Sequence, residues 1–117
     1  MTIEQVAQVA YEVNKAYCSA IGDNTQVEWD VAPQWQKDSA ISGVKFHLEN
    51  PHVSPEQAHA EWARHKRAEG WSYGPEKDVF KKQHPNLAEY KDLSIEQKAK
   101  DYFFRQLVRS LAKYIDK

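Results

Sequence analysis

Apolar side chains recur at helical spacing over the first twenty residues of the chain. The string Thr-Ile-Glu-Gln at 2–5 has the spacing of a capping box, in which a hydroxyl caps the first backbone N–H groups of a helix. An apolar stripe then covers residues 3–20, and Gly22 is placed to end it. The pattern predicts an amphipathic helix of roughly five turns. Cys18 lies beside the stripe and is expected to be a small semi-buried thiol rather than a nucleophile.

A second helix is predicted from Pro33, which suits a first turn, to the Asn-Pro pair at 50–51. Gly43 weakens this helix and is expected to mark the close approach of another helix. Trp29, in the polar loop before it, is expected to fold back on the core. The positions of this helix expected to be buried are Trp35, Ile41, Val44 and Leu48.

A third helix is predicted to begin at a second capping box, Ser-Pro-Glu-Gln at 54–57, and to run to Glu69. Gly70 follows as its C′ glycine. The apolar stripe of this helix is thin, with Trp62 as its main anchor.

No helical period survives between Trp71 and Leu93. Short extended pieces are expected at 71–73 and 87–90, with turns at Gly74-Pro75 and His84-Pro85. The string Ser-Ile-Glu-Gln at 94–97 opens a last helix with the strongest apolar stripe of the chain: Ala99, Tyr102, Phe103, Leu107, Val108, Leu111 and Tyr114.

These patterns predict a mainly α fold with a few short β-strands. About four helices surround one core, and a Trp-rich loop joins the third helix to the fourth. A chain of 117 residues is expected to form a single domain, residues 1–117. No apolar run approaches the ~20 residues of a membrane-spanning helix, and no secretory signal is evident. With a lone cysteine, these features predict a cytoplasmic protein that does not bind membranes.

The formal net charge is −1, but the charges are unevenly distributed. Residues 1–61 hold three Lys or Arg against nine Asp or Glu, whereas residues 62–91 hold seven against four. A mild local basic excess suits a small anionic ligand better than a nucleic-acid backbone, so no nucleic acid is expected as a partner.

Helix-end geometry groups three side chains after the third helix. If Gly70 is the C′ residue, Trp71 is C″ and packs on the C3 residue, Lys66. Trp62 lies four residues before Lys66 on the same helical face. The predicted arrangement is a ladder, Trp62–Lys66–Trp71. Tyr73 would share a face with Trp71 if that piece is extended.

The ladder has two interpretations. In the structural one, the indoles sandwich the Lys66 stem, and a cation–π contact of ~0.5–2 kcal/mol pins the loop to the helix. In the functional one, Trp62 and Trp71 form a slot for a flat ring, and Lys66, Lys77 or Lys82 meets a phosphate or carboxylate. Geometry alone favours the structural interpretation.

The residues after the ladder have structural explanations as well. Asp78 is expected to be a buried turn residue that caps backbone N–H groups, and His84 to bond the backbone within a turn rather than to catalyse. The chain carries no Gly-rich phosphate loop and no nucleophile with a nearby base, so no catalytic residues and no cofactor are predicted. His59 and His65 point to different faces of their helix, and no metal site is predicted.

A longer string resembles the RyR domain, the repeat found in tandem in the cytoplasmic part of ryanodine receptor calcium channels. The pattern G-W-x-Y-G-x-x-K/R-D followed by K/R-x-H-P-C-L matches from Gly70 to Leu87, with Asn86 where the family usually has Cys. The role of that cysteine therefore does not transfer. The matching positions are Trp62, Lys66, Gly70, Trp71, Tyr73, Gly74, Lys77, Asp78, Lys82, His84, Pro85, Leu87, Tyr90, Leu93, Lys100 and Asp101, with Pro75 inside the motif.

The resemblance implies a RyR-repeat-like core over residues 51–117 and a helical extension over 1–50, similar to small single-repeat proteins of bacteria and phages. In the receptor repeats, tryptophans of this motif line a site for adenine nucleotide and aromatic small molecules. Carried over, the ligand-binding residues are Trp62 and Trp71, supported by Tyr73 and by the nearby Lys66, Lys77, Lys82 and His84. Paired packing of the tandem repeats suggests a homodimer.

Three functions follow as hypotheses. The first is a non-catalytic module for a nucleotide or nucleotide-derived signal, in the setting of phage–host conflict that has been proposed for prokaryotic members. The second is a protein-interaction or structural domain without a small-molecule ligand. The third, an enzyme, has the least support because no catalytic constellation is present.

Overall fold

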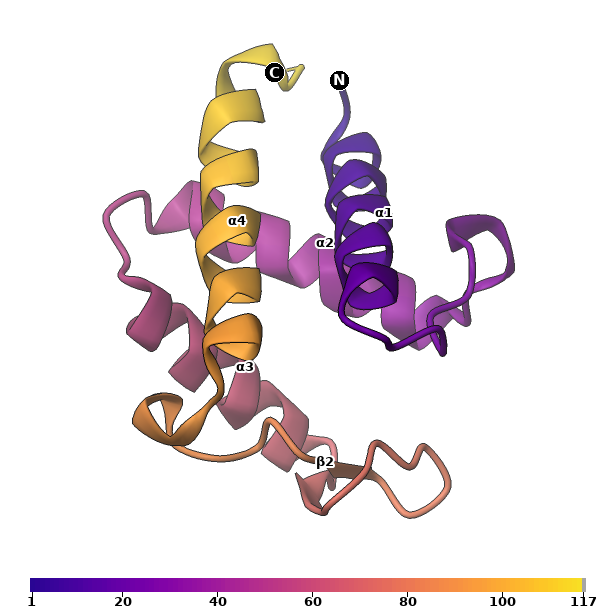
Figure 1. Cartoon of the computed structure of the whole chain (residues 1–117). Helices are drawn as coiled ribbons and strands as arrows, with labels where there is room; N and C mark the ends of the chain where they lie inside the picture. Colours follow the sequence, from indigo (N-terminus) through magenta and orange to yellow (C-terminus); the bar gives the residue numbers. More distant parts are fainter. Residues whose placement is uncertain (117) are drawn as a thin grey trace. The chain divides into compact units, whose positions relative to one another are not determined.

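The computed structural model describes residues 1–116 (Figure 1). Within them the α-helices are α1 (Ile3–Ala20), α2 (Gln34–Glu49), α3 (Pro55–Ala68) and α4 (Ile95–Leu111). Short 3-10 helices are η1 (Trp29–Val31), η2 (Tyr90–Asp92) and η3 (Ala112–Tyr114), and the strands are β1 (Ser72–Tyr73) and β2 (Gln83–His84). The expected mainly α fold with a few short strands is confirmed.

The chain divides into two compact units. One, the helical unit, contains Met1–His52 and the chain from Phe103 onward; the other, the loop unit, is Val53–Tyr102. The division falls inside α4, whose first half belongs to the loop unit. That residues 1–117 form one folding domain stays a prediction. No helix within residues 1–116 is long and apolar enough to cross a membrane.

The helical unit is built on α1 and α2. Thr2 and Gln5 exchange both hydrogen bonds of the expected capping box, and Gly22 ends α1 with a φ of +96°. The predicted close approach at Gly43 is confirmed, because a Cβ there would lie 3.1 Å from the Phe104 ring. Seven buried residues form the core: Val6, Ala7, Tyr11, Trp29, Ala32, Val44 and Val108.

Of the positions expected to be buried in the helical unit, Val44 and Trp29 are buried, whereas Trp35 and Tyr114 are not. Trp29 folds back on the core as predicted, and Cys18, expected to be semi-buried, is fully buried. Trp35, expected inside, keeps 38% of its surface exposed, and Tyr114 keeps 56%. Both were assigned from helical spacing, yet an amphipathic ring can pack one edge and leave its polar tip in water, so spacing alone overstates its burial.

In the loop unit, the end of α3 has the predicted geometry. Gly70 has a φ of +94°, and its N–H donates to the carbonyl of Arg67 at 3.0 Å. The N–H of Trp71 donates to the carbonyl of Lys66 at 2.9 Å. These two bonds form a Schellman motif, which a glycine at C′ makes possible because a left-handed backbone costs it little.

The two strands pair in parallel, with Ser72 opposite Gln83 and Tyr73 opposite His84. The expected strand at 71–73 is confirmed in its last two residues, but the second one, expected at 87–90, is wrong. The partner strand comes earlier, at 83–84, and its Gln-His sequence lacks the β-branched residues that usually signal a strand. Residues 84–87 instead form a turn, closed by the Leu87 N–H and the His84 carbonyl at 3.3 Å.

Candidate functional site

Five rings of the loop unit form a continuous series, which we call the aromatic row. The ring centroids of Trp71 and His84 are 6.3 Å apart, and those of His84 and Trp62 are 5.1 Å apart at 79° between their planes. Trp62 lies 5.5 Å from His59, which lies 5.9 Å from Tyr90. The row therefore connects α3, β2 and η2 through face and edge contacts of favourable geometry.

A lysine lies over the ring at each end of the aromatic row. The Lys66 ammonium is 5.2 Å from the Trp71 centroid, and the Lys98 ammonium is 5.5 Å from the Tyr90 centroid. Both distances are within the range of a cation–π interaction. Lys66 is also buried, with 7% of its surface exposed, and this burial lowers the pKa of its ammonium.

The expected ladder is confirmed at its contact between Lys66 and Trp71. The structure adds a member that sequence reasoning placed elsewhere: the imidazole of His84 contacts both indoles. Helix-end geometry could not show this, because His84 belongs to a later segment, β2, that pairs with β1.

His84 also bonds the backbone, as the sequence predicts. Its Nδ1 accepts the N–H of Asn86 at 3.1 Å, within the turn that follows β2. Because Nδ1 is an acceptor in this bond, the neutral imidazole carries its hydrogen on Nε2.

The pKa of His84 is lowered to about 4, and burial is the main cause. The positive charges of Lys77, Lys100 and Lys66 lower it further, in that order. His84 is therefore neutral at pH 7 and surrounded by a positive field.

The loop between the strands is held by Asp78 and Gln83, which exchange two backbone hydrogen bonds of 2.9 and 3.0 Å. The carboxylate of Asp78 accepts the N–H of Lys81 at 3.0 Å, which confirms its role as a turn residue. Asp78 is half-buried rather than buried. A Cβ on Gly74 would lie 2.6 Å from the Cβ of Gln83, so only glycine fits there.

Lys82 has a φ of 53°, and its ammonium donates to the carbonyl of Glu69 at 2.9 Å. This carbonyl is at the end of α3, where a cation is favoured by the helix dipole. That Lys82 contacts an anion stays a prediction. In the structure its side chain connects the loop to the end of α3.

Other residues of the motif differ in burial. Tyr73 is 64% exposed whereas Trp71 is 6% exposed, so they do not share a face as expected. Trp71 is positioned by the helix end rather than by the strand, which explains the difference. Lys77 is exposed and Pro85 is half-buried in the turn after β2, while the bend at Gly74 continues into an exposed Pro75.

A polar group behind Trp62 was missed by sequence reasoning. His59 is 4% exposed, and its Nε2 lies 2.9 Å from the carbonyl of Ala88. Its Nδ1 lies 3.8 Å from the Asp101 carboxylate. The hydroxyl of Tyr90 is buried without a hydrogen-bond partner in the described chain.

Burial raises the pKa of Asp101 to about 7, partly offset by Lys100. Burial also raises the pKa of Tyr90 to about 12, with Tyr102 and Asp101 adding to the effect. The sequence did not reveal this group because His, Tyr and Asp count as polar when an apolar stripe is sought. The six-residue spacing of His59 and His65 was considered only as evidence for or against a metal site.

Asn86 connects the turn to α4. Its side-chain amide donates to the side-chain oxygen Oε1 of Gln97 at 2.7 Å. The Ser94 hydroxyl accepts the Gln97 N–H at 3.2 Å, so half of the third capping box is confirmed. The amide that replaces the usual family cysteine therefore holds the turn against the first turn of α4.

Comparison with known proteins gives one family. The model of the RyR domain matches residues 48–115, more than half of the chain and the whole of the aromatic row. No curated protein matches the chain.

Proposed function

Because the chain belongs to the RyR domain family, we propose that it is a non-catalytic module that binds a nucleotide or nucleotide-derived signal at the aromatic row. The observation that carries this proposal is the contact of His84 with both Trp62 and Trp71, beside the buried Lys66 ammonium. Flat rings and a cation held together by three separate segments suit a ligand that is both aromatic and anionic.

The two indoles have different parts in this proposal. Trp71 is 6% exposed and is covered by Lys66 and His84, so it supports the other rings and has little surface left for a ligand. Trp62 keeps a half-buried ring and is the indole with surface left for stacking. We therefore expect the ligand's base to stack on Trp62.

Stacking alone is too weak to explain useful affinity. One base on one aromatic ring contributes ~1–3 kcal/mol, whereas a micromolar dissociation constant corresponds to about 8 kcal/mol. The rest must come from contacts with a charged group of the ligand. This is why a nucleotide fits the proposal better than an uncharged base.

Isothermal calorimetry with AMP, ADP-ribose and a cyclic dinucleotide tests the proposal. The wild type is expected to bind at least one of them, and Trp62→Leu to lose that binding. Trp35→Leu is the matched control, since Trp35 is a partly exposed indole of the helical unit. A wild type that binds none of the three, or equal binding by Trp62→Leu, overturns the proposal.

A second candidate, a protein-interaction domain, is supported by a different observation. Phe80 is fully exposed, and Val79 is 47% exposed, in the loop held by Asp78 and Gln83. An aromatic side chain presented in this way is typical of an anchor for a partner protein. Co-purification of a specific partner that is lost in Phe80→Ser, with nucleotide binding absent in the wild type, would favour this candidate.

A further inference from the structure

Lysines from three separate segments of the loop unit lie near enough to His84 for their charges to act on its imidazole. The first is Lys77. The antiparallel pairing of Asp78 with Gln83 places Lys77 opposite His84, one step further along the two chains. Lys77 is an exposed residue of this loop.

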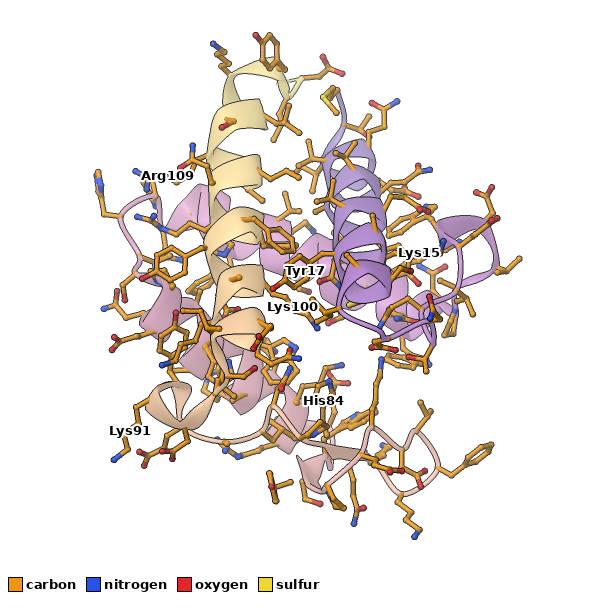
Figure 2. The ribbon with its side chains drawn as sticks, in the orientation of Figure 1. Lys15, Tyr17, His84, Lys91, Lys100 and Arg109 are labelled. Carbon is orange, nitrogen blue, oxygen red and sulfur yellow. The ribbon has the colours of Figure 1, made fainter. Side chains whose placement is uncertain are left out.

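The second lysine comes from α4. The Asn86–Gln97 hydrogen bond of 2.7 Å ties the turn after His84 to this helix, and Lys100 lies one turn further on the same face. Its neighbour Asp101 lies against His59 of the aromatic row. Figure 2 shows the Lys100 side chain leaving α4 on the side where His84 lies.

The third lysine, Lys66, lies over Trp71, the neighbour of His84 in the aromatic row. Its ammonium is 5.2 Å from the indole centroid, and that centroid is 6.3 Å from the imidazole. The effect of the three lysines on His84 agrees with this geometry, because each of them lowers its pKa.

We propose that the three lysines and the Nε2–H of His84 form an anion site that binds a phosphate group of the ligand. This inference rests on the proposed function and specifies the charged end of the ligand. The donors come from α3, the loop between the strands, β2 and α4, so the site exists only when the loop unit is folded.

The charge and the hydrogen bonds favour a phosphate over a carboxylate. A phosphate monoester carries about two negative charges at neutral pH and three acceptor oxygens. Three ammonium groups and one neutral N–H match such a group better than they match a single negative charge. Lys82, which the sequence also suggested, is outside this set because its ammonium lies at the end of α3, on the carbonyl of Glu69.

A comparison of adenosine with AMP separates the anion site from the stacking surface. In calorimetry at low salt, AMP is expected to bind about tenfold or more tightly than adenosine to the wild type. Lys77→Gln and Lys100→Gln are each expected to weaken AMP binding more than adenosine binding and so to remove much of this advantage. The matched controls are Lys81→Gln and Lys91→Gln, two exposed lysines of the same unit.

Inorganic phosphate provides a probe that does not depend on stacking. Added phosphate is expected to shift the NMR signals of the His84 imidazole and to raise its pKa, because an anion stabilises the protonated ring. The groups that face His84 are Lys66 and His59 from α3, Lys77 from the loop and Lys100 from α4. In Lys77→Gln and Lys100→Gln the shift by phosphate is expected to be smaller.

The outcomes distinguish the two proposals. Equal binding of adenosine and AMP overturns the anion site and leaves the stacking proposal standing. A phosphate shift at His84 without binding of AMP, ADP-ribose or the cyclic dinucleotide supports the anion site and overturns nucleotide recognition. If none of the three nucleotides binds and phosphate does not shift the NMR signals of His84, both proposals are overturned. Thermal unfolding of each variant checks that the loop unit remains folded.

Discussion

The Nδ1 atom of His84 lies 3.1 Å from the backbone nitrogen of Asn86 and accepts its hydrogen. Protonation of the ring would place a hydrogen on Nδ1 and break this bond. It would also add a positive charge among the lysines around the ring. The turn that presents the imidazole to Trp62 and Trp71 is thus compatible only with a neutral histidine.

The first prediction concerns stability in acid. The pKa of His84 is about 4 in the folded chain and about 6.5 in the unfolded chain, so the unfolded chain binds the proton more readily. Stability that is fully present above pH 6.5 is therefore lost as the pH falls towards 4, by on the order of 3 kcal/mol. Guanidinium unfolding at pH 7 and pH 4 measures this. The variant His84→Asn can keep an acceptor for the turn without titrating, and it should lose less stability over that range; an equal loss contradicts the prediction.

Asp101 is expected to act in the opposite direction. Its pKa is about 7 when folded and about 3.9 when unfolded, so the folded chain holds the proton longer. This group makes the protein less stable as the pH rises from about 4 to 7, by on the order of 3 kcal/mol. Asp101→Asn should remove that decline and be more stable than the wild type at pH 8. The exposed Asp92→Asn is the control, and an Asp101→Asn variant no more stable than it at pH 8 would refute the assignment.

Gly74 should not tolerate a side chain. A Cβ would lie 2.6 Å from the Cβ of Gln83, an atom too close to the backbone to move away. Gly74→Ala is expected to separate β1 from β2 and to destabilise the loop unit by about 2 kcal/mol or more. Gly22→Ala is the comparison, since it has a φ of +96° with open space around it and should cost only the ~1 kcal/mol of a left-handed backbone.

Rescue distinguishes a steric cause from a conformational one. Gln83→Gly removes the Cβ that Gly74→Ala would meet, so the double variant should be more stable than the sum of the two single losses predicts. Chemical denaturation of the four proteins measures the coupling. Additive losses would show that the contact between residues 74 and 83 is not the cause.

The hydrogen bond between Asn86 and Gln97 should couple the turn to α4. A double-mutant cycle with Asn86→Ala and Gln97→Ala is expected to give an interaction free energy of about 1 kcal/mol. Asn86→Cys, which restores the usual family residue, should lose the same bond and behave like Asn86→Ala. Zero coupling in the cycle would mean that the amide does not hold the turn.

The sequence was most informative where local chemistry decides the structure. Two capping boxes form completely, at Thr2 and Ser54, because each needs only residues a few positions apart. The end of α3 at Gly70 also depends only on neighbouring residues, so the sequence predicted the contact of Trp71 with Lys66. The predicted contact depends on one left-handed residue and on nothing distant.

The part that could not be predicted depends on long-range pairing. His84 meets the indoles because β2 pairs with β1, and two-residue strands leave little periodic signal in a sequence. His59 was overlooked because a histidine counts as polar, although its bond to Ala88 allows complete burial. The sequence thus predicted a ladder of two indoles and one lysine, whereas the structure has a row of five rings.

The last prediction separates the structural role of Lys66 from its role in binding. Burial lowers the pKa of its ammonium, so holding a charge beside Trp71 costs stability, whereas the apolar stem contributes packing. Lys66→Met keeps a stem of similar length and should be as stable as the wild type or up to about 1 kcal/mol more stable, while Lys66→Ala should lose about 2 kcal/mol by leaving a void. Both variants should lose part of the binding advantage of AMP over adenosine. If Lys66→Met keeps that advantage in full, the ammonium does not contact the phosphate and its role is confined to packing against Trp71.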